Sequence, residues 1–390
     1  MLKHTDITTR RISQFAKNEL LPALLADLAE LSVEFCPVAH PDQASAEAGP
    51  WEPVKQGFEY GPAYRTAWFR LRGKLPEGAS GEIGLIAEVG GERTVWRDNS
   101  PWRGLDEPHN VLPVANPDAR ATSFSPDARP GAKIEVYVQA YTMNPQVRVH
   151  GREPEREALV AKVGPCKLVS VDRDVLDLLY DFEFASSLLG ALADTDPSHA
   201  ILLRALNDVC NAYAVGKREA ITRCRKIVRE ALTSLPGPLK HSIVPVGHAH
   251  LDTAWLWPLE MTMKKMAHTA ATQLHLLERY PEYVFCHSQA SQYEWLELQY
   301  PKLFERVREA IRQGRWEVVG SMWVEADCNL TGAESLVRQF LYGRRYFKEK
   351  LGVTTDDMWL PDVFGYAASL PQILEKFNIR YFLTQKISWN

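Results

Sequence analysis

The sequence contains no long uncharged apolar run and no excess of charge of either sign. No stretch approaches the roughly 18 apolar residues that a membrane-spanning helix needs, and the opening MLKHTDITTRRISQF lacks the apolar core of a signal peptide. Lys plus Arg number 45 against 49 Asp plus Glu, so the formal charge is -4 and does not point to nucleic acid or an anionic membrane. We therefore expect a soluble protein that binds neither nucleic acid nor membrane.

Cysteine is also scarce, and no two of the six cysteines form a CxxC pair or another metal-binding spacing. Isolated cysteines in a chain of this length are typical of reduced, mostly buried thiols, so we expect a cytoplasmic location. The 45% hydrophobic and 24% charged content is ordinary for a globular chain, and 390 residues allow two or three domains. This composition identifies no oligomer, although a homo-oligomer is compatible with it.

The pattern of apolar residues changes along the chain and predicts four segments. Apolar residues recur at helical spacing over 8–33, then alternate with polar ones between clusters of Pro, Gly, Asp and Asn, and return to helical spacing up to Pro236. The predicted segments are an N-terminal helical segment (1–48), a β-rich sandwich-like domain (49–172), a helical bridge (173–238) and the first part of an α/β barrel (239–390).

In the last segment, predicted strands and helices alternate. Strands of this kind, separated by helices, imply βαβ crossovers and a parallel sheet, either open or closed into a barrel. The predicted strands are 242–247, 283–288, 316–320, 357–361 and 379–384, with helices at about 262–279, 291–313, 333–350 and 370–377.

Histidines and carboxylates follow the predicted strands. His248, His250 and Asp252 stand at alternating positions after the first strand, so an extended backbone would point them to one side. Imidazoles and a carboxylate form half of a shell for a divalent metal such as zinc, which binds these atoms at about 2.0–2.2 Å. The strands that follow end in similar residues, namely His287, Gln289, Glu325, Asp327 and Asp362.

Each of these residues has a structural explanation when it is taken singly, such as a helix cap or a hydrogen-bonded histidine in the core. Their shared position at the carboxyl ends of parallel strands, where such folds bind ligands, favours a metal site. A metal held there can activate water for amide or ester hydrolysis, or can bind sugar hydroxyls while a carboxylate attacks carbon. Spacing alone does not choose between them.

Three motifs resemble the class II α-mannosidases of glycoside hydrolase family 38: HAHLDTAWLWPL, GSMWVEADCNLTG and LPDVFGYAASLPQIL. The resemblance is closest to the vacuolar and bacterial cytoplasmic branch and is strongest after residue 240. It implies a parallel (β/α)7 barrel, one zinc ion, and a retaining mechanism on the terminal α-linked mannose of oligosaccharides.

The motif match also implies roles for individual residues. His250 and Asp252 would be zinc ligands, and Asp327 would be both a ligand and the catalytic nucleophile. Trp255 would line the sugar pocket, and His248 would act behind the ligands. Asp362 matches a position near the site to which the resemblance gives no role.

The chain departs from the family pattern at its end. The family's general acid and its last zinc ligand, a histidine, lie beyond the position that matches Asn390, and five predicted strands stand where seven are needed. We therefore expect an incomplete barrel that lacks part of the site. Two other classes of function stay open: a metal-dependent deacetylase or amidohydrolase, and a carbohydrate-binding protein without catalysis.

Overall fold

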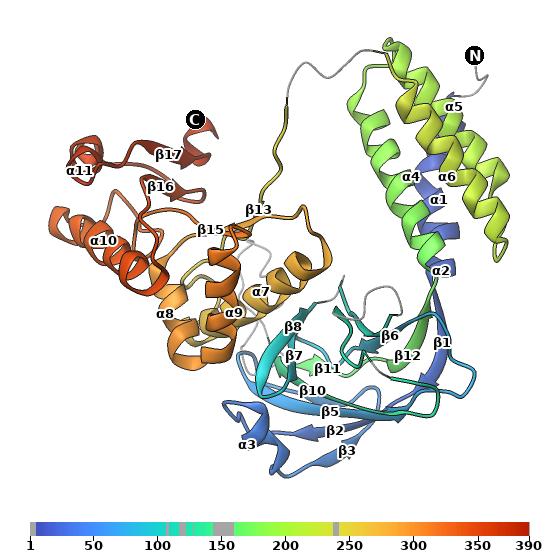
Figure 1. The fold of residues 1–390 in the computed structure, drawn as a ribbon, viewed down its shortest axis with the longest axis horizontal. Coiled ribbons are helices and arrows are strands. Elements are labelled where there is room, and N and C mark those ends of the chain that lie inside the picture. Colours follow the sequence, from blue (N-terminus) through green and yellow to red (C-terminus); the bar gives the residue numbers. More distant parts are fainter. Residues whose placement is uncertain are drawn as a thin grey trace.

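A computed structural model describes residues 5–106, 109–116, 122–126, 128–142, 160–236 and 242–389. The described chain forms a helical bundle, a β-sandwich and an α/β part, and the sandwich lies at the lower end of both other parts in Figure 1. None of the helices in these ranges is long and apolar enough to cross a membrane. All six cysteines are free and buried, as their isolated positions predict.

The helical bundle joins the N-terminus to the middle of the chain. Its apolar faces share one core, in which the rings of Phe15 and Phe182 lie 5.0 Å apart. Asp172 caps one of its helices by accepting a hydrogen bond from the Val175 amide at 3.1 Å. The bundle consists of α1 (Thr5–Phe15), the π-helical turn η1 (Ala16–Leu20), α2 (Leu21–Leu24), α4 (Arg173–Ala191), α5 (Pro197–Ala212) and α6 (Arg218–Thr233).

The prediction of helix over residues 8–33 is wrong after Leu24. There the chain forms β1 (Leu25–Glu30) and β2 (Ser32–Cys36). Helical spacing of apolar residues is a weak preference that tertiary contacts override. Here the contacts are backbone ladders, because β1 pairs with β12 (Cys166–Val171) and β2 pairs with β5 (Thr66–Lys74).

The β-rich segment folds into two antiparallel sheets that face each other. Their strand orders are β1-β12-β6-β9 and β3-β2-β5-β10-β7-β8. Side chains from both sheets, such as Leu85 and Leu168 from one and Phe69 and Val136 from the other, form a single core. The remaining strands are β3 (Glu52–Val54), β6 (Glu82–Ala87), β7 (Glu92–Arg97), β8 (Ser100–Leu105), β9 (Val111–Ala115) and β10 (Lys133–Tyr141), with α3 (Gln43–Glu47) before β3 and a small β4 (Glu59–Tyr60) and β11 (Ala161–Lys162) pair.

The α/β part alternates strand and helix as predicted, and its ladders are parallel. Within the described residues, however, the strands form two sheets, β13-β14-β15 and β16-β17, and the predicted barrel is not confirmed. Asp357 joins the two sheets, because its carboxylate accepts from the Gly320 amide at 2.6 Å and its carbonyl from the Ser321 hydroxyl at 2.8 Å. The elements are β13 (Gly247–His248), α7 (Leu259–Arg279), β14 (Phe285–His287), α8 (Ala290–Gln299), α9 (Pro301–Arg312), β15 (Trp316–Val318), α10 (Ala333–Tyr346), η4 (Phe347–Leu351), β16 (Asp357–Leu360), α11 (Leu370–Lys376), β17 (Tyr381–Thr384) and η5 (Lys386–Trp389).

The first predicted strand, 242–247, is wrong in extent and in burial. Only Gly247 and His248 pair with β14, while Ile243 and Val244 are 81% and 83% exposed. The β-branched residues give this segment a strand preference, but strands are stabilised by pairing and packing with neighbours. Among the described residues, no strand lies beside 242–246.

The sandwich holds the first helix of the α/β part. The Gly104 amide on β8 donates to the Thr272 hydroxyl on α7 at 3.1 Å, and Lys265 on α7 forms an ion pair with Glu92 on β7. Tyr64 donates its hydroxyl proton to the Leu256 carbonyl, just before α7. These contacts fix the segment between β13 and α7, which carries the predicted ligands.

Candidate metal centre

His250, Asp252 and Asp362 converge beyond the carboxyl ends of β13 and β16. The His250 Nε2 atom lies 3.4 Å from the Asp252 Oδ1 atom and 3.5 Å from the Asp362 Oδ2 atom. One donor atom from each residue lies within 4.8 Å of the others. Residues more than 100 positions apart therefore meet at one point, although β13 and β16 belong to different sheets.

Glu325 holds His250 from the opposite side of the imidazole. Its carboxylate lies 2.8 Å from the His250 Nδ1 atom, and its other oxygen accepts from the Ser288 hydroxyl at 2.5 Å. Burial alone lowers the pKa of His250, but Glu325, together with Asp252 and Asp362, outweighs burial and raises that pKa to about 9. A carboxylate at Nδ1 leaves Nε2 directed at the two aspartates, the arrangement that orients histidine ligands of metals.

Two glutamines fix the loop that carries His250 and Asp252. Gln289 and Gln292 both donate to the Leu251 carbonyl, at 2.9 and 2.8 Å. Gln289 also accepts from the Thr253 hydroxyl at 2.8 Å, and its backbone has a φ of 66°, a strained conformation for a residue other than glycine. Such strain is found where surrounding contacts over-determine a functional site.

Asp362 uses its two oxygens differently. Oδ2 faces His250, while Oδ1 forms an ion pair with the Lys386 ammonium group at 2.6 Å. The sequence marked Asp362 by its position after the fourth strand and by its place in the LPDVFGYAASLPQIL motif, but it did not indicate Lys386, Ser288 or Gln292. No motif singles out those three, and only the folded chain brings them to the site.

The donor set fits a divalent transition metal. The His250 Nε2 atom is buried and has no hydrogen-bond partner among the described residues, although it faces two carboxylates. A buried polar atom without a partner costs about 1–3 kcal/mol, and a metal ion would remove that cost. One imidazole nitrogen with carboxylate oxygens suits zinc and similar metals.

The other residues named from the sequence are not among the three converging residues. Asp327 is exposed, and its Oδ1 atom accepts from the Asn329 and Leu330 amides at 2.8 and 2.6 Å, so its carboxylate is not one of the three converging groups. Trp255 is 64% exposed. His248 accepts from the Trp359 indole at 3.1 Å. The roles assigned to Asp327 and Trp255 stay predictions.

Comparison with known proteins gives two family matches. Residues 240–390 match the glycosyl hydrolases family 38 N-terminal domain, and residues 26–164 match the jelly roll domain of α-mannosidase. The first match contains the whole candidate metal centre, and the second covers the two facing sheets apart from β12 and the first residue of β1.

Several curated proteins align with most or all of the chain. Human alpha-mannosidase 2C1 is 32% identical over 100% of this chain and 38% of its own length, and alpha-mannosidase G of Dictyostelium discoideum is 27% identical over 100% and 37%. The alpha-mannosidase of Saccharomyces cerevisiae is 30% identical over 85% of this chain and 31% of its own length. The chain thus spans less than two fifths of these relatives, and its residues 240–390 carry the N-terminal domain of glycosyl hydrolases family 38 behind an α-mannosidase jelly roll domain at 26–164.

Proposed function

We propose that this chain is the metal-binding part of a retaining α-mannosidase that removes terminal α-linked mannose from oligosaccharides. The observation that carries the proposal is the convergence of His250, Asp252 and Asp362 inside the region that matches the family 38 domain. The two parallel sheets and their helices would belong to a (β/α)7 barrel. Six buried free thiols suit a reducing compartment, so we place the protein in the cytoplasm.

We further propose zinc as the metal. His250, Asp252 and Asp362 would hold it, and Asp327 would complete the ligand set after a movement of the exposed loop that carries it. When bound, the ion supplies positive charge that attracts sugar hydroxyls and keeps nearby carboxylates ionised. Glu325 keeps the His250 ring oriented, and Gln289 and Gln292 keep its loop in place.

In the proposed reaction, Asp327 acts as the nucleophile. One carboxylate oxygen forms a bond to the anomeric carbon, the bond from that carbon to the glycosidic oxygen breaks, and the departing oxygen takes a proton from a general acid. Water then attacks the same carbon, loses a proton to the conjugate base of that acid, and the Asp327 carboxylate leaves. Glu325 is not assigned as the acid, because His250 and Ser288 already engage both of its oxygens.

The test is hydrolysis of a nitrophenyl α-mannoside by this 390-residue chain with Zn²⁺ supplied. Nitrophenolate is a good leaving group and needs little help from an acid, so the substrate reports on the nucleophile. We expect turnover that Asp327→Asn and a chelator each abolish, while Asp356→Asn, which removes an exposed partner of Arg380, leaves it unchanged. A fluorinated mannoside should label Asp327 covalently.

Other outcomes would contradict the proposal. Turnover that survives Asp327→Asn would exclude this residue as the nucleophile. Metal-dependent release of acetate from an acetylated sugar, without a covalent sugar adduct, would favour a deacetylase. No turnover with or without metal would overturn the proposal for this chain.

A further inference from the structure

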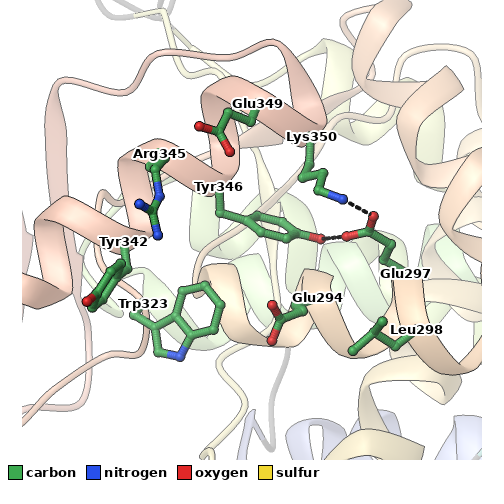
Figure 2. A pocket seen from close by; sticks show the side chains of 9 residues that line it. All are labelled: Glu294, Glu297, Leu298, Trp323, Tyr342, Arg345, Tyr346, Glu349 and Lys350. Atoms are coloured by element: carbon green, nitrogen blue, oxygen red, sulfur yellow. Dashed lines mark hydrogen bonds and ion pairs between the residues drawn. The ribbon is translucent and has the colours of Figure 1, made fainter.

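A cavity, which we call the outer cavity, lies between α8, α10 and η4 of the α/β part (Figure 2). Its volume is about 420 Å³, within the range of roughly 300–1,000 Å³ that is typical of small-molecule sites. None of the three converging metal-site residues lines it. The lining side chains are Glu294, Glu297, Leu298, Trp323, Tyr342, Arg345, Tyr346, Glu349 and Lys350.

Three aromatic rings form one wall of this outer cavity. Trp323 meets Tyr346 edge to face with ring centroids 6.0 Å apart, and Tyr342 lies on the same side, with the Arg345 guanidinium 5.1 Å from its ring centre (Figure 2). Aromatic rings of this kind offer a flat apolar surface with a polar edge. The C–H face of a sugar ring stacks on such a surface.

The polar groups of the outer cavity carry both signs of charge. Glu297 accepts the Tyr346 hydroxyl proton at 3.0 Å and forms an ion pair with Lys350. Glu294 and Glu349 have no ion-pair partner among the described residues and offer free acceptor oxygens, while Arg345 offers donors. A neutral ligand rich in hydroxyls uses donors and acceptors together, whereas an anion or a cation would meet a like charge.

The outer cavity is built on the same segment as the candidate metal centre. The Trp323 amide donates to the Gln339 carbonyl on α10 at 3.0 Å, and the Trp323 carbonyl accepts from the Ser291 amide on α8 at 3.0 Å. These two bonds fix Trp323 between the helices, and two residues later Glu325 contacts His250. The stretch that carries Trp323 and Glu325 therefore contributes to both places.

We propose that the outer cavity is a second carbohydrate site, which holds one sugar residue of a mannose-containing glycan through the Trp323, Tyr342 and Tyr346 rings and the Glu294 and Glu349 carboxylates. Such a site would retain a branched glycan near the candidate metal centre without taking part in the chemistry. Binding at this site does not require hydrolysis.

The test is a ligand-observed NMR titration with α-1,2-mannobiose in the His250→Ala background, which removes a ligand of the candidate metal centre. We expect saturable binding that Tyr342→Ala and Glu294→Gln each weaken at least tenfold. Both side chains are partly exposed, and urea unfolding midpoints equal to that of the parent will show that the fold is intact. Leu341→Ala is the matched control, because Leu341 is exposed on α10 outside the cavity and its loss should leave binding unchanged.

The outcomes separate this inference from the proposed function. Mannobiose binding that is unaffected by Tyr342→Ala and Glu294→Gln, or no binding at all, overturns the second site whether or not the chain hydrolyses mannosides. Binding that both variants weaken, in a chain without hydrolytic activity, supports the second site and counts against the proposed reaction alone.

Discussion

The charge of Glu325 should control how tightly the candidate centre binds a metal. Its side chain is only 5% exposed and lies 2.8 Å from the His250 Nδ1 atom. Glu325→Gln keeps the size of the side chain and an acceptor oxygen, but it removes the charge that makes the imidazole a better ligand. Loss of such a supporting group costs about 10- to 100-fold in metal affinity, or about 1.4–2.7 kcal/mol.

The pH dependence follows from the pKa of His250, which its acidic neighbours raise to about 9 against its burial. A proton must leave before Nε2 can bind a metal, so the apparent affinity of the parent protein should rise about tenfold per pH unit from 7 to 9. Glu325→Gln lowers the pKa of His250, so the apparent metal affinity of the variant should stop rising at a lower pH than that of the parent. The metal affinity of Glu325→Gln should therefore fall furthest below that of the parent near pH 9, and the difference should become smaller toward pH 7.

Competition for Zn²⁺ with a chromophoric chelator at several pH values measures both effects. Glu317→Gln is the control, because Glu317 is an exposed carboxylate on β15. Equal affinity of the parent and Glu325→Gln at pH 9 would refute the positioning role of Glu325. Parallel pH profiles would refute its effect on the pKa of His250.

Three further predictions concern stability and packing. Phe182→Ala should lower the free energy of unfolding by about 3–5 kcal/mol, because the ring is fully buried in the bundle, and chemical denaturation monitored by circular dichroism measures this. Gly343→Ala places a methyl carbon 2.5 Å from the backbone of 321–322 and should cost about 1–3 kcal/mol, whereas Gly190→Ala, which meets nothing within 4 Å, should not destabilise the protein. Burial and nearby arginines lower the pKa of His275 to about 3 in the folded protein. Below about pH 6.5 this histidine therefore binds a proton in the unfolded chain but not in the folded one, so the free energy of unfolding should fall as the pH drops toward 3. Urea unfolding at pH 7 and 5 measures this effect. The free energy of unfolding should fall less between these two pH values for His275→Gln than for the parent, and equal falls would contradict the low pKa of His275.

The sequence located the elements of the α/β part better than their pairing. Glycine and proline punctuation and helical spacing placed α7, α10, α11 and the strands β14 to β17 close to their observed positions, but the single helix predicted over 291–313 is two helices, α8 and α9, because Pro301 begins a new helix. The same spacing predicted a helix over 25–33, where the backbone instead pairs with β12 and β5. Local preference is weak compared with a ladder that satisfies every backbone group of a strand.

The sequence by itself determined which residue types stand at the ends of the parallel strands, since the fold class brings those ends together once strand and helix alternate. This was enough to place His250, Asp252 and Asp362 among the polar residues at those ends, but the ligand set that the sequence predicted was His250, Asp252 and Asp327, and only the folded chain brings Asp362 to the first two. Only the tertiary structure decided that Glu325 turns inward to His250 while Asp327, two residues later, is exposed. Loop conformation fixes the direction of each side chain, and it depends on contacts between distant residues that no local pattern encodes.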